Sequence, residues 1–166
     1  MTTPISSPRQ HASNPVLSGI AQIQSSLSST VTTGATGIPA DNTIPQSNEG
    51  VELYTVTVTP KNANSTLLMF AQMQTTGGSS GRHVLALFRD DETDAFHAAA
   101  RQASSSSLQH MLTHCLVPAG STATRTYKMR AGLAAGTLTF NGESAAGMYG
   151  GVLSSGLTII EIPPLD

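Results

Sequence analysis

The chain has 166 residues, with 8 Lys and Arg against 10 Asp and Glu and a formal net charge of −2. Charged residues make up only 11% of the chain, which argues against a nucleic-acid-binding face or an acidic tail. The single cysteine excludes an intrachain disulfide framework, and no apolar run approaches the ~20 residues that cross a bilayer. We therefore expect a product made in the cytoplasm, with no membrane insertion and no nucleic-acid partner.

The first 50 residues divide into three segments. Residues 1–15 are polar, contain three prolines, and are expected to form an extended attachment peptide. Residues 31–50, rich in Gly, Pro and Asn, are predicted to be a linker. Between them, residues 16–30 carry apolar side chains at spacings of four, three and four, as on a helical heptad seam: Val16, Ile20, Ile23 and Leu27. The run covers about two heptads, so two alternatives stay open: a short helical stalk that holds three chains together, or a linker with incidental spacing.

Alternating apolar and polar residues predict strands from residue 51 onward. The stretch 108–131 holds two such runs around a Pro-x-Gly-Ser break, and we expect it to form a hairpin at the centre of a sheet. Residues 95–101 fit a strand or a helix. The other predicted strands lie at 51–59, 66–74, 83–89, 136–141 and 157–162.

Short strands separated by turn signals, without alternating helices, predict an all-β fold. The most economical arrangement is an antiparallel jelly-roll-like β-sandwich of about eight strands over residues 51–166. An extended N-terminal arm and the short helix would precede it.

His110 and His114 are the candidates for metal binding. On a strand they share a face but lie about 13 Å apart at ~3.3 Å per residue, too far for one metal within a subunit. In a trimer, three copies of one histidine could meet on the symmetry axis. Packing or solvent exposure is the favoured interpretation, because Met111 stands where the helical zinc motif has Glu. We expect no cofactor.

Residues 142–156 form a Gly-rich loop whose larger side chains lack an obvious place in a core. Met148, Tyr149 and Val152 are therefore candidates for contact with a ligand or receptor, since a tyrosine ring packs while its hydroxyl hydrogen-bonds. The alternative is packing at an interface between subunits. No nucleophile elbow or phosphate-binding loop occurs in the sequence, so we expect a protein that is not an enzyme.

Several stretches resemble the C-terminal domain of phage appendage proteins, which are tail-fibre, head-fibre and gene-transfer-agent spike subunits. They are DNTIPQSNEG at 41–50, ALFRDDETDA at 86–95, LVPAGSTATRTYKMRAG at 116–132, TFNG at 139–142 and the closing LTIIEI. The resemblance covers residues 41–162 and supplies no catalytic residues. It implies an N-terminal attachment arm, a linker or coiled stalk, and a trimeric β-sandwich knob.

Together these features predict a virion structural protein, a homotrimeric phage fibre or spike assembled in the host cytoplasm. Its N-terminal arm would bind capsid or tail proteins, and its knob would project outward for attachment to a host-surface glycan or protein. The alternative function is a carbohydrate-binding receptor-recognition module.

Overall fold

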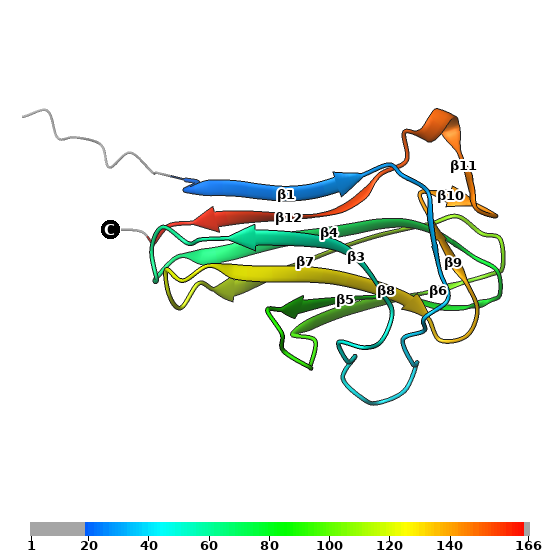
Figure 1. The fold of residues 1–166 in the computed structure, drawn as a ribbon, viewed down its shortest axis with the longest axis horizontal. Coiled ribbons are helices and arrows are strands. Elements are labelled where there is room, and N and C mark those ends of the chain that lie inside the picture. The colour runs from blue at the N-terminus through cyan, green and yellow to red at the C-terminus, as the bar shows by residue number, and fades with distance from the viewer. Residues whose placement is uncertain (1–18, 165–166) are drawn as a thin grey trace, which may run out of the picture.

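The computed structural model describes residues 19–164, which form strands and short connections (Figure 1). Their only helical element is the three-residue 3-10 helix η1, Tyr149–Gly151, and none of their segments is a helix with the length and apolar character of a membrane span. The strands are β1 Gln22–Ser28, β2 Thr32–Gly34, β3 Val51–Val58, β4 Thr66–Gly77, β5 Gly81–Arg89, β6 His97–Ala103, β7 Gln109–Pro118, β8 Arg125–Leu133, β9 Leu138–Phe140, β10 Gly142–Glu143, β11 Ala146–Gly147 and β12 Ser155–Ile162.

Ten of the twelve strands form two antiparallel sheets that pack face to face, and β10 and β11 form a separate two-stranded sheet. Sheet I contains β1, β12, β4, β9, β2 and β7, and sheet II has the order β3-β8-β5-β6. Thr75 pairs with Gln109 of β7 and also with Phe140 of β9, so β7 and β9 lie on opposite sides of β4. The β10–β11 hairpin stands at one corner of the sandwich (Figure 1). The predicted all-β, jelly-roll-like architecture is confirmed.

The core lies between the sheets and follows the predicted alternation. Leu67 and Met69 of β4 point inward from sheet I and are fully buried, as are Leu85 of β5 and Met129 of β8 from sheet II. Side chains at successive positions of a strand point to opposite faces, so each strand contributes every second residue to this core. The predicted strands at 51–59, 66–74, 83–89, 136–141 and 157–162 correspond to β3, β4, β5, β9 and β12.

The predicted helical stalk at 16–30 is wrong for residues 22–28, which form β1 and pair with residues 155–161 of β12. A spacing of four places Ile23 and Leu27 on one face of a strand as well as on one face of a helix. The open edge of β12 supplies backbone partners that an isolated short helix lacks. Val16 and the predicted attachment peptide at 1–15 lie outside the described residues.

The predicted central hairpin at 108–131 is also wrong. β7 is an edge strand of sheet I and pairs with β4, whereas β8 lies inside sheet II between β3 and β5. The turn at Pro118–Ser121 therefore carries the chain from one sheet to the other. The ambiguous residues 95–101 belong mainly to strand β6, which pairs with β5.

The segment predicted as a linker, residues 31–50, is part of the folded domain. It contributes β2, and its Ile38 is buried with Val84, Ala86 and Phe88 on the side of β5 that faces away from the main core. Sheet II is therefore covered on both sides near β5. This explains why β5 is nearly continuous in apolar residues, as expected for a strand buried on both faces.

Candidate functional site

The surface of sheet I that faces away from the core, here called the outer face, carries rows of apolar side chains. One row crosses four strands through Ile23, Ile160, Leu68 and Leu116, which are successive cross-strand partners. A second row contains Leu27 and Leu112, with Gly156 and Gln72 between them. The row between these two holds Ser25, Thr158, Phe70 and His114, so apolar and uncharged polar or histidine side chains alternate on this face.

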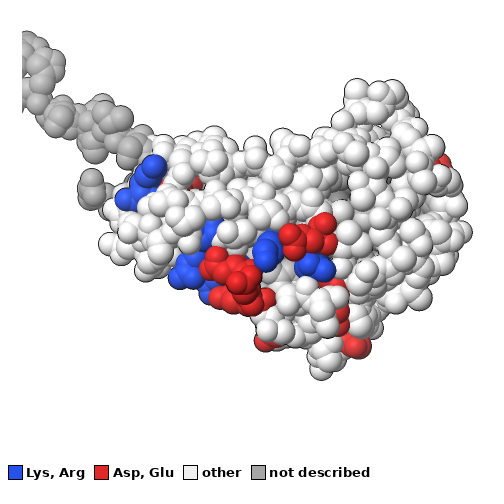
Figure 2. Space-filling model, viewed as in Figure 1, with Lys and Arg blue, Asp and Glu red and all other residues white. Residues whose placement is uncertain are grey.

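The outer face has exposed histidines but no exposed Lys, Arg, Asp or Glu. Strands β1, β4 and β7 contain no Lys, Arg, Asp or Glu, and the one charged residue of β12, Glu161, is buried. Figure 2 shows the charged side chains gathered over one part of the surface, while the rim where β1 and β12 lie carries almost none. Four ion pairs, from Arg89–Glu92 to Arg130–Glu52, all join residues of sheet II and its loops.

Large apolar side chains of the outer face are open to solvent. Ile23, Leu27, Leu112 and Leu116 are 54–62% exposed, and Phe70 is 37% exposed. Single exposed apolar residues are ordinary on soluble proteins, but several on the same side of one sheet make that side a candidate interaction surface.

Both candidate histidines lie on the outer face. His114 is the cross-strand partner of Phe70, with ring centroids 6.2 Å apart, and His110 is the partner of Gln74. Within residues 19–164 no group of three His, Cys, Asp or Glu side chains is placed to hold a metal ion. Metal binding by three copies of one histidine on an axis stays a prediction.

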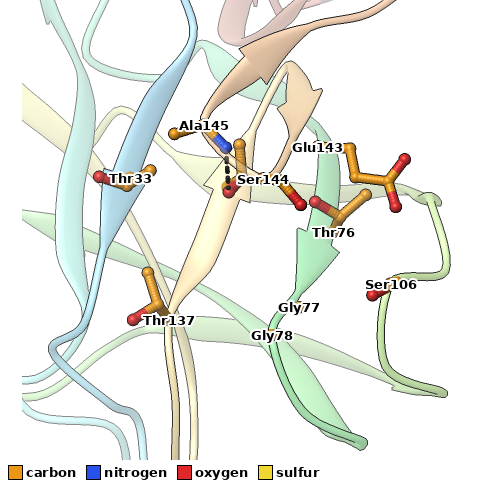
Figure 3. Close-up of a pocket in the computed structure, with 10 residues that line it drawn as sticks. Thr33, Thr76, Gly77, Gly78, Ser106, Thr137, Glu143, Ser144 and Ala145 are labelled. Atoms are coloured by element: carbon orange, nitrogen blue, oxygen red, sulfur yellow. Dashed lines mark hydrogen bonds between the residues drawn. The ribbon is translucent and has the colours of Figure 1, made fainter.

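A second candidate site is a cleft of about 240 Å³ near the β10–β11 corner (Figure 3). Strands β2, β4, β9 and β10 and the loop before β7 bring its residues together. Glu143 is the only charged residue among those that line it, and most of the others carry hydroxyl groups: Thr33, Thr76, Ser106, Thr137, Thr139 and Ser144, with Gly77, Gly78 and Ala145.

Buried and partly buried hydrogen bonds hold the loop that forms one wall of this cleft. The side chain of Asn141 donates to the carbonyl oxygens of Ser28 and Thr30 at 3.0 Å and accepts a 2.6 Å bond from Ser155. The hydroxyl of Thr76 donates to the carbonyl of Gly142 at 2.9 Å. The loop conformation is fixed by these contacts.

The same loop stores backbone strain. Asn141, Ser144 and Ala145 have φ angles of 60°, 48° and 62°, which side chains other than glycine rarely adopt. Residues held in such conformations concentrate at ligand-binding and active sites. The strained backbone therefore makes the wall that carries Glu143 a candidate ligand-binding site.

His83 lies behind the Gly77 wall of the cleft. A Cβ atom on Gly77 would stand 2.8 Å from the His83 Nε2 atom, so only glycine leaves room for the ring. Nδ1 of His83 lies 2.8 Å from the Thr75 hydroxyl, whereas Nε2 has no partner among the described residues. Burial lowers the pKa of His83 and favours the neutral ring.

The predicted contact residues lie in and beside η1. Tyr149 is 68% and Val152 is 76% exposed, and Met148 is half-buried. Neither exposed residue belongs to the core clusters. Their proposed role in ligand or receptor contact stays a prediction.

Sequence reasoning singled out the 142–156 loop but not the cleft beside it. Thr33, Thr76 and Thr137 come from separate segments, and no spacing in the sequence connects them. The Asn-Gly pair at 141–142 was the available signal, since both residue types mark positions of unusual backbone conformation.

Residues 24–165 match the model of one protein family, described as the Pgp3 C-terminal domain. No curated protein matches the chain. The resemblance to phage appendage proteins stays a prediction, because the family found in this way is a different group.

Among solved structures, this chain is similar to one of the infectious bursal disease virus Gx strain, with a TM-score of 0.40 and 10% identity over 88% of this chain and 43% of that chain. It is also similar to the VP2 subviral particle of infectious bursal disease virus, with a TM-score of 0.40 and 10% identity over 86% of this chain and 34% of that chain. A third similar structure is the enzymatically active domain of tailspike protein 4 from bacteriophage CBA120, with a TM-score of 0.30 and 13% identity over 72% of this chain and 18% of that chain. The chain thus spans less than half the length of each, and likenesses at this level say nothing about function.

Proposed function

The chain belongs to the Pgp3 C-terminal domain family, and from this premise we propose that it is a structural subunit of a phage or phage-like particle. In this proposal three copies form a short fibre or spike that has no catalytic activity. The β-sandwich is the projecting knob, and residues 1–15 bind capsid or tail proteins.

The observation that carries the proposal is the outer face of sheet I, which has several exposed apolar side chains and no exposed Lys, Arg, Asp or Glu. Leu112 and Leu116 stand open to solvent there, although sheet II is covered at the corresponding position by Ile38. In a threefold ring, one part of this face would pack against a different part of the same face on the next copy, so that apolar area leaves water on every subunit. Copies of this chain are therefore the occupant we assign to it.

The path of the chain supports the same arrangement. β1 is an edge strand of sheet I, and its Ile23 and Leu27 belong to the outer face. Residues that precede Gln22 therefore join the domain at the rim of the proposed contact. The N-terminal segments of three copies would then start close together and could bind one site on a particle. Binding through three weak contacts at once increases the overall affinity.

The oligomeric state in solution tests this assembly. We expect light scattering on the full chain to give the mass of a trimer of the 17.1 kDa subunit. Leu112→Glu should shift the protein to monomers without unfolding it, because Leu112 is 56% exposed and an unpaired charge in an apolar contact is costly. Thr57→Glu, at an exposed position of β3 in sheet II, is the matched control and should remain trimeric. A wild-type monomer, or a trimer that tolerates Leu112→Glu, would contradict the proposal.

The location on a particle requires a separate measurement. We expect mass spectrometry of purified particles from cells that express the chain to detect it, in a copy number divisible by three. Its absence from such particles would contradict the virion role, whatever its oligomeric state in solution.

A further inference from the structure

The cleft beside Glu143 has a lining suited to one class of ligand. We propose that it binds a polyhydroxylated molecule the size of one monosaccharide, and that it prefers a sugar with an amino group to a sugar with a carboxylate. This inference does not depend on the proposed assembly, because residues of a single chain form the entire cleft.

The first argument is the pattern of hydrogen-bonding groups. Among the residues described, the side chains of Glu143, Thr33 and Thr137 make no hydrogen bond, while Thr76 and Thr139 bond to the loop wall. A carboxylate accepts bonds from two neighbouring hydroxyl groups, and each threonine hydroxyl both donates and accepts. A sugar offers hydroxyl groups that match both properties.

The second argument is size and rigidity. About 240 Å³ is less than the ~300–1,000 Å³ of sites for drug-sized ligands, so the cleft suits a single sugar ring. Its wall is fixed by the bonds of Asn141 to Ser28, Thr30 and Ser155. A preformed wall reduces the entropy lost on binding, which small ligands cannot otherwise offset.

The third argument is charge. Figure 3 shows Glu143 and Ser106 on one side of the cleft and Thr33 on the other, and no basic side chain belongs to the lining. An ammonium group on the ligand would be attracted to the carboxylate, and a carboxylate on the ligand would be repelled. The expected order of affinity is therefore glucosamine, then glucose, then glucuronate.

Calorimetric titration of the full-length protein with these three sugars at equal ionic strength tests the proposal. For glucosamine we expect a dissociation constant of about 1–10 mM, which is the range for a small ligand without an aromatic platform. Glu143→Gln should weaken glucosamine binding about 10-fold and abolish the preference over glucuronate. Thr137→Val, which keeps the shape but removes a hydroxyl, should weaken glucosamine and glucose alike by about 3-fold.

Glu92→Gln is the matched control, because Glu92 is an exposed carboxylate outside this cleft, and it should bind like the wild type. No heat at 100 mM glucosamine would overturn the proposal. Unchanged affinity in both cleft variants would also overturn it, and glucuronate binding as tight as glucosamine binding would overturn the assigned preference. Light scattering on the same samples reports assembly separately, so the two proposals succeed or fail independently.

Discussion

The side-chain amide of Gln22 donates a 2.6 Å hydrogen bond to the carboxylate of Glu161, 139 positions further along the chain. The same carboxylate accepts bonds from the backbone amides of Lys61 and Asn62 at 2.8 and 3.2 Å. It thereby joins β1, β12 and the turn between β3 and β4. Burial by itself would raise the pKa of Glu161, but the hydrogen bonds from Gln22, Lys61 and Asn62 outweigh this effect and hold the pKa below its ordinary value.

Replacing this carboxylate should destabilise the fold. We expect Glu161→Gln to lower the free energy of unfolding by about 2 kcal/mol at pH 7, because one of its two acceptor oxygens becomes a donor that faces backbone amides. The folded pKa lies below the ordinary value of 4.5, so the contribution of the carboxylate is complete above that pH and is lost as the pH falls through the folded pKa. Urea denaturation measures the free energy of unfolding of both proteins at pH 7 and below pH 4. The difference between wild type and variant should be smaller below pH 4 than at pH 7. Equal stability of the two proteins at pH 7 would refute this role.

His83 adds a second pH dependence of the free energy of unfolding, at a higher pH than that of Glu161. Burial lowers the pKa of His83, so the unfolded chain binds a proton near the ordinary value of 6.5 while the folded chain stays neutral. The free energy of unfolding should therefore fall as the pH drops below about 6.5. His97, whose pKa is lowered by burial and by the charge of His114, acts in the same direction.

Denaturation at pH 8, 6.5 and 5 measures this dependence. In His83→Gln, which cannot take up a proton, the loss of stability between pH 8 and pH 5 should be smaller than in the wild type. The remaining loss should decrease further when His97→Gln is added. An identical pH dependence in wild type and His83→Gln would exclude His83 as a source.

Strict alternation made the core strands visible in the sequence. In β3 the apolar residues alternate with threonines, so Val56 could be assigned to the core without coordinates, whereas β4 is apolar on both faces and its alternation does not by itself decide which face is buried. β7 shows where this reasoning ends. Alternation places Leu112 and Leu116 on one face but does not say whether that face meets the second sheet or the solvent.

Contacts between distant segments could not be predicted. The turn at Pro118–Ser121 has the composition of a hairpin turn, yet it crosses between sheets, because the choice of partner strand depends on β3, β4 and β5. The burial of Glu161 could not be predicted from the sequence either, because its partners Gln22 and Lys61 are 139 and 100 positions away. Spacing of apolar residues alone also failed at β1, where helix and strand fit Ile23 and Leu27 equally.

Neighbouring leucines of β4 separate folding from assembly. Leu67 is fully buried in the core, and Leu68 is half-buried on the outer face. Leu67→Ala should lower the free energy of unfolding by about 2–5 kcal/mol, as expected for a cavity in a packed core. Leu68→Ala should change the unfolding of the isolated subunit little but increase the dissociation constant of the trimer.

Chemical denaturation and light scattering at several protein concentrations distinguish the two effects, because the apparent stability of an assembly depends on concentration. If Leu68→Ala destabilises the fold as much as Leu67→Ala, at every concentration, the outer face is not an interface between subunits.

The exposed loop at η1 offers a test of outward contact that leaves fold and assembly intact. Tyr149 and Val152 are 68% and 76% exposed and belong to neither core cluster, so Tyr149→Ala and Val152→Ala should each leave the free energy of unfolding within about 0.5 kcal/mol of the wild type. If the loop contacts a host receptor, both variants should reduce adsorption of the trimer to host cells. Tyr149→Ala should have the larger effect, because an aromatic ring with a hydroxyl contributes both packing and a hydrogen bond. Adsorption is measured as the fraction of labelled protein removed from solution by the cells, with Thr57→Ala on sheet II as the matched control. Adsorption equal to the wild type in both loop variants would exclude this loop as the contact, and a reduction accompanied by loss of the trimer would assign it to the interface between subunits instead.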